Sequence, residues 1–154
     1  LAITHLELAY RYPHDLEVRT AVARASLYSG FAISSTRTTA PHSVSYPLTV
    51  YFGIPHGLAV SLTLPAFMRY NAEEVPDRLQ LITEALGECN IDDAIIRVER
   101  LIRNIGLPTR LREVGLHKKD LEVIVKHGFR LDRAANNPRP LTEQALKHIL
   151  RSVY

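Results

Sequence analysis

Residues 38–57, TTAPHSVSYPLTVYFGIPHG, decide how the rest of the chain is interpreted. They place His42 and His56 fourteen residues apart, with three helix-breaking residues between them: Pro47, Gly53 and Pro55. On one straight helix this spacing would keep both side chains on nearly one face but about 21 Å apart. Two ligands of one metal ion lie only about 3 Å from each other, since each nitrogen lies about 2.1 Å from the ion. We expect the breaks to fold the chain back and to allow a shared metal site.

His56 follows Pro55 and opens a predicted helix that runs to about Tyr70. The positive end of the helix dipole favours the neutral imidazole, which is the form that binds metal. An isolated histidine at a helix start is more often a surface or capping residue. Two imidazoles also do not complete a site, because catalytic zinc or iron generally has at least three protein ligands. From the residues alone, His42 and His56 can be either a metal-binding pair or two surface histidines.

The rest of the chain has helical periodicity, with apolar residues recurring at three and four positions. Predicted helices cover residues 15–34, 77–86, 92–105, 119–127 and 142–154, and a short helix ends at Gly115. Asp15 is expected to cap the first of these helices, whose many small residues predict a buried central position. Pro47 argues against a central strand over residues 45–52. We predict an all-α helical bundle of seven or eight helices, without a domain boundary.

The composition is that of one globular domain. The chain has 154 residues, of which 46% are hydrophobic, and a net charge of +3. At this size a chain buries roughly two thirds of its unfolded surface, enough for a core without disulfides. Its basic residues form no block, which argues against nucleic-acid binding. The longest apolar stretch, residues 57–68, is too short to span a bilayer, so we expect a cytoplasmic protein that binds no membrane.

The start of the chain bears on its organisation. It opens with Leu1, and its only methionine is Met68. We therefore expect that residue 1 is not a translation start and that a segment has been removed before it.

The sequence resembles the C-terminal helical domain of the iron-dependent alcohol dehydrogenases, which has a dehydroquinate synthase-like fold. The resemblance covers nearly the whole chain. The matching residues, in order and spacing, are Ser29-Gly30-Phe31-Ala32, His42, Pro55-His56-Gly57, Leu64-Pro65, Asn71 and Asn137-Pro138-Arg139-Pro140.

The resemblance implies that His42 and His56 are two of four metal ligands. The other two ligands, an Asp and a His, are then expected before Leu1. An α/β nucleotide-binding domain for NAD or NADP is expected there as well. The metal would be Fe2+, with Zn2+ as the alternative. The chain is expected to be the C-terminal part of an alcohol dehydrogenase or aldehyde reductase that transfers hydride between NAD(P) and a small alcohol or aldehyde. This part is expected to be inactive alone. The resemblance leaves open whether the protein forms a homodimer.

The chain departs from the family pattern at Tyr46, where many members carry a histidine near the nicotinamide. A tyrosine can relay a proton, but with an unperturbed pKa near 10 it is a poorer acid-base group at neutral pH. Residues 38–42 and 45–48 resemble branches that act on acid-bearing aldehydes such as phosphonoacetaldehyde. Arg37 would be an anion contact for such a substrate, and an exposed loop arginine is the alternative.

A free-standing basic helical module that binds an anionic partner is the alternative function. Its basic residues are Lys118, Lys119, Lys126, Arg130, Arg133 and Arg139, with Glu122 and Asp132 among them. An ordinary solvated face explains this pattern better, because acids are interspersed with the bases.

Overall fold

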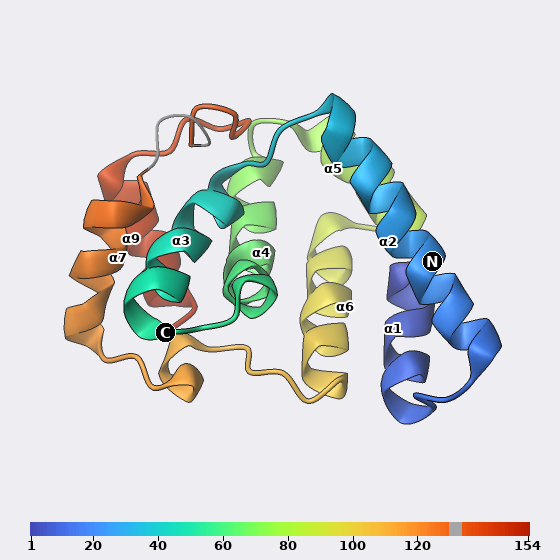
Figure 1. The fold of residues 1–154 in the computed structure, drawn as a ribbon. Coiled ribbons are helices and arrows are strands. Elements are labelled where there is room, and N and C mark those ends of the chain that lie inside the picture. Colours follow the sequence, from blue (N-terminus) through green and yellow to red (C-terminus); the bar gives the residue numbers. More distant parts are fainter. Residues whose placement is uncertain (130–133) are drawn as a thin grey trace.

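The computed structural model describes residues 1–129 and 134–154, and every regular element in them is helical (Figure 1). The α-helices are α1 (Ala2–Arg11), α2 (Leu16–Ser35), α3 (Ala40–Phe52), α4 (His56–Ala72), α5 (Pro76–Leu86), α6 (Ile91–Asn104), α7 (Leu121–Gly128) and α9 (Glu143–Ser152). Two 3-10 turns, η1 (Leu111–Val114) and η2 (Lys118–Asp120), connect α6 to α7. The prediction of an all-α fold is confirmed for the described residues.

Local signals set several helix ends where they were expected. The carboxylate of Asp15 accepts the Val18 amide at 3.0 Å and caps α2. Gly87 ends α5 in the left-handed region, with φ +77°, which a residue with a side chain rarely adopts. Residues 2–11, for which no helix was predicted, form α1, which lacks a side-chain hydrogen bond at its N-cap. A helix without this cap carries little sequence signal at its start.

The hydrophobic core is built from α3, α4, α7, α9 and the turns that join α6 to α7. Phe67 on α4 is 1% exposed and packs with side chains from the other elements. The largest buried apolar members are Phe67, Leu48, Leu111, Ile124, Leu146 and Leu150. The core therefore lies on the α3–α4 side of the molecule (Figure 1).

No described helix combines the length and apolar composition that crossing a bilayer requires.

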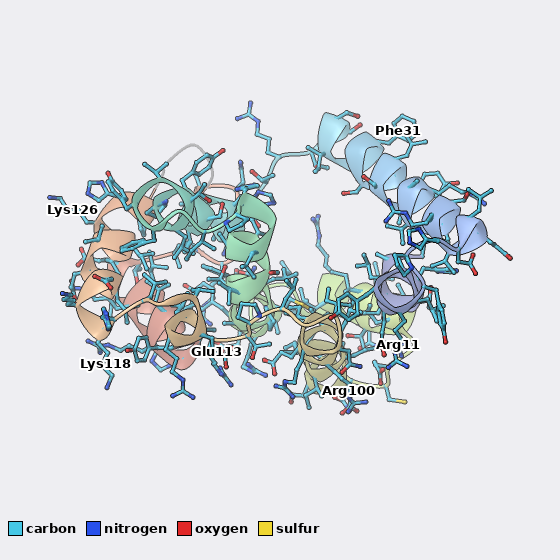
Figure 2. The ribbon with its side chains drawn as sticks, turned by 60° about the horizontal axis from the view of Figure 1, so that its bottom comes forward. Arg11, Phe31, Arg100, Glu113, Lys118 and Lys126 are labelled. Carbon is cyan, nitrogen blue, oxygen red and sulfur yellow. The ribbon has the colours of Figure 1, made fainter. Side chains whose placement is uncertain are left out.

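The prediction that α2 is a buried central helix is wrong. None of its 20 residues is buried, and Phe31 is 61% exposed. Its main helical neighbour is α1, and α1 also contacts α6. Figure 2 shows Phe31 on α2 at the opposite end of the molecule from Lys118 and Lys126. The small and apolar residues of α2 predicted burial, but no described element covers most of its surface.

Pro47 does not interrupt a helix, contrary to the prediction. It lies inside α3 and is buried. A proline at this position has no amide hydrogen to donate to the carbonyl four residues earlier. Its ring nevertheless packs against α7, since its Cγ would lie 3.6 Å from a Cβ added at Gly128. The actual break is Gly53, which has φ +68°, followed by Ile54 and Pro55.

The end of α4 is joined to the segment before α9 by polar contacts. The side chains of Asn71 and Asn137 exchange two hydrogen bonds, at 2.7 and 3.3 Å. The Tyr70 hydroxyl donates to the carbonyl of Pro140 at 2.7 Å. Arg139 pairs with Glu73 at 2.7 Å and lies over the Tyr70 ring at 4.4 Å. These contacts attach residues 137–140 to the core.

Candidate metal centre

The turn between α3 and α4 brings His42 and His56 together. His42 is the third residue of α3, and His56 is the first residue of α4. Their ring centroids are 5.3 Å apart, with the ring planes at 49°. His42 is half-buried and His56 is exposed, so the pair faces outward at the edge of the core. The expected fold-back of the chain is present, and residues 53–55 produce it.

The separation of the two rings fits shared metal binding. An imidazole nitrogen lies about 2.1 Å from a bound zinc ion, and the ring centre lies roughly 1 Å farther out. Two such rings on one ion have centroids roughly 4.4 Å apart at a right angle and roughly 5.1 Å apart at the tetrahedral angle. The 5.3 Å between His42 and His56 is close to the tetrahedral value. Imidazole nitrogen also suits both iron and zinc.

The described residues supply only part of a ligand set. Within residues 1–129 and 134–154, no three His, Cys, Asp or Glu side chains gather in a way that could hold an ion. Catalytic zinc sites use at least three protein ligands. A complete centre on this histidine pair therefore needs donors from outside the described part of the chain.

Ser45 connects the two histidines and was not among the predicted site residues. It is completely buried. Its Oγ donates a hydrogen bond to the carbonyl of His42 at 2.7 Å and lies 3.1 Å from Nδ1 of His56. The signal that could have identified it is its place one helical turn after His42, where side chains share a face.

The structure also places Tyr46 beside the pair. Tyr46 is half-buried on α3, and its ring centroid lies 6.1 Å from that of His56. Arg37 is exposed on the connection between α2 and α3, five residues before His42. The phenol therefore borders the histidines, whereas Arg37 lies on a surface segment that leads to them.

The basic surface proposed as an alternative is weakly supported. Lys118, Lys119 and Lys126 are exposed, and Figure 2 shows Lys118 and Lys126 on the α7 side of the molecule. The guanidinium of Arg139 is paired with Glu73 and does not stand as an open cation. Glu122 pairs with Lys147 at 3.3 Å; Glu143 and Glu122 both raise the pKa of Lys147 through hydrogen bonds. Three residues of the alternative lie outside the described residues: Arg130, Asp132 and Arg133.

Comparison with known proteins identifies the family. Residues 1–154 match the sequence model of the Fe-containing alcohol dehydrogenase family, C-terminal. The chain belongs to this family. It is 29% identical to the 1,3-propanediol dehydrogenase of Klebsiella pneumoniae over 163 aligned residues, which cover 100% of this chain and 42% of the relative. The chain thus spans about two fifths of that relative's length.

Solved structures agree with the family assignment. A 1,3-propanediol oxidoreductase superposes with a TM-score of 0.91 at 28% identity, over 99% of this chain and 42% of that one. Sulfoacetaldehyde reductase from Bifidobacterium kashiwanohense, solved in complex with NAD+, gives a TM-score of 0.90 at 30% identity, over 98% and 40% of the two chains. The described helices therefore have the arrangement found in the C-terminal part of Fe-containing alcohol dehydrogenases.

Proposed function

We propose that this chain is the metal-binding C-terminal part of an alcohol dehydrogenase or aldehyde reductase, and that His42 and His56 supply two ligands of its metal. The observation that carries the proposal is the 5.3 Å separation of the two rings, which suits two ligands of one ion. Membership of the Fe-containing alcohol dehydrogenase family supports the reaction class. The reaction is hydride transfer between NAD(P) and a small alcohol or aldehyde.

The residues of this chain divide the work at the proposed centre. His42 and His56 would hold Fe2+, or Zn2+ in its place, and the ion would supply a Lewis acid for the substrate oxygen. Tyr46, whose ring borders His56, would donate a hydrogen bond or a proton toward the reacting oxygen. Arg37 would contact the acid group of an acid-bearing aldehyde. The existence of a relative that reduces sulfoacetaldehyde, itself an acid-bearing aldehyde, supports this substrate class.

The remaining ligands and the nucleotide site are proposed to belong to an α/β domain that precedes Leu1. Three observations support this arrangement. The chain spans 42% of the length of its 1,3-propanediol dehydrogenase relative, and the matched family region is the C-terminal one. The apolar residues of α2, such as Phe31 and Leu27, are more than half exposed and would be covered by such a domain.

Zinc titration of the chain joined to the proposed α/β domain, which would supply the remaining ligands, tests the metal centre. His42→Ala and His56→Ala are each expected to weaken zinc binding at least tenfold, because each removes one of two adjacent nitrogen donors. His148→Ala is the matched control, since His148 is an exposed histidine on α9. Equal zinc affinity in the wild type and both site variants would contradict the proposal. The chain alone is also expected to reduce no aldehyde with NAD(P)H, and turnover by it would contradict the proposed need for a second domain.

A further inference from the structure

A single buried hydroxyl links the backbone of one histidine to the ring of the other. Ser45 is 0% exposed, and its Oγ contacts the carbonyl oxygen of His42 at 2.7 Å and Nδ1 of His56 at 3.1 Å. Both distances lie in the range of hydrogen bonds. The two contacts together determine which partner donates in each.

A serine hydroxyl has one proton and can donate only once. The carbonyl oxygen of His42 has no hydrogen, so the 2.7 Å contact requires Ser45 to donate there. Only lone pairs of Oγ then face His56, and the 3.1 Å contact is favourable only if Nδ1 of His56 carries a hydrogen. The other tautomer would place a lone pair of Nδ1 against a lone pair of Oγ, and the contact would be repulsive.

We propose that Ser45 is a positioning residue that holds neutral His56 in the tautomer with hydrogen on Nδ1. This tautomer leaves the lone pair on Nε2, the nitrogen available to a metal ion. Hydrogen bonds to the second ring nitrogen orient metal-binding histidines, and their loss typically lowers metal affinity by about 10–100-fold. The effect on metal binding rests on the proposed function, whereas the tautomer follows from the contacts of Ser45 alone.

Nitrogen NMR of the metal-free chain, labelled with 15N in its histidines, tests the tautomer. The His56 signals are assigned by their loss in His56→Ala, under conditions in which the ring is neutral. The wild type is expected to carry the hydrogen on Nδ1, and Ser45→Ala is expected to move the population toward the Nε2 form. A wild-type ring with its hydrogen on Nε2 would overturn the proposal, as would an unchanged tautomer in Ser45→Ala.

Ser61→Ala is the matched control for this experiment. Ser61 on α4 also donates to a carbonyl three residues earlier, that of Leu58, at 2.9 Å. Ser61→Ala is expected to leave the His56 tautomer unchanged. A shift as large as that in Ser45→Ala would show a general effect of serine removal and would overturn the specific role.

Zinc titration separates this inference from the proposed function. Ser45→Ala is expected to bind zinc about tenfold or more weakly than the wild type and Ser61→Ala. Unchanged affinity would overturn the role of Ser45 in metal binding. If the wild type joined to the proposed α/β domain bound no zinc, the proposed metal centre would be overturned instead, and the NMR result would still decide whether Ser45 sets the ring of His56.

Discussion

Tyr46 and Arg37 are two residues whose proposed roles can be separated by kinetics in the chain joined to the proposed nucleotide-binding domain. Tyr46→Phe keeps the ring beside His56 but removes the hydroxyl, so kcat is expected to fall about tenfold or more with little change in KM. Tyr46→His should restore activity near neutral pH, since the unperturbed pKa of histidine is about 6.5. An unchanged kcat in Tyr46→Phe would contradict a catalytic role of the hydroxyl and would indicate that the side chain only packs.

Arg37→Gln is expected to raise KM for acid-bearing aldehydes and to leave KM for uncharged aldehydes unchanged.

At the scale of elements, α7 sets the position of α3, the helix that carries His42. Gly128 at the end of α7 lets the two helices approach closely, because a Cβ added there would lie 3.5 Å from the Cα of Val44. The hydroxyl of Ser43 also donates to the carbonyl of Gly128 at 2.6 Å. The contact between these helices therefore depends on the size of residue 128.

Two substitutions at Gly128 test this contact by urea unfolding. Gly128→Ala is expected to change the free energy of unfolding by less than about 1 kcal/mol, because its Cβ would make ordinary contacts. Gly128→Val is expected to lower it by about 1–3 kcal/mol, since added methyl groups must push α7 away from α3. If valine were tolerated as well as alanine, the close approach of the two helices would not matter for stability.

At the scale of the whole molecule, burial is uneven between the α3–α4 side and α2. Phe67 on α4 is 1% exposed, whereas Phe31 on α2 is 61% exposed. Phe67→Ala is expected to lower the free energy of unfolding by about 3–5 kcal/mol, as core truncations do. Phe31→Ala should change it by no more than about 0.5 kcal/mol, as surface substitutions do. Urea unfolding of the isolated chain measures both.

The comparison of these two aromatic residues also tests the proposed second domain. Joined to the α/β domain, the protein is expected to lose more stability from Phe31→Ala than the isolated chain does, because the ring would then be covered. A large loss in the isolated chain itself would contradict the exposed position of α2. Equal small losses in both forms would contradict the proposal that the domain covers this helix.

Most helix positions and the histidine pair could be predicted from the sequence, because their signals are local. Asp15 and Thr142 cap helices through amides three residues later, whatever the rest of the chain does. Prediction failed where distant packing decides the outcome. Pro47 normally disfavours a helix interior, yet it is buried in α3 against α7. The small residues of α2 likewise indicated burial, but no described element covers most of that helix.

The sequence by itself determined the helical class, the family resemblance and the two candidate ligands, since periodicity, caps and a histidine spacing depend on neighbours along the chain. Only the tertiary structure decided that the rings of His42 and His56 lie 5.3 Å apart and that Ser45 contacts both residues. The physical reason is that the 3.1 Å contact between Ser45 and His56 joins two helices. The length of this contact depends on how the turn at residues 53–55 and the packing of α3 on α4 orient the two helices.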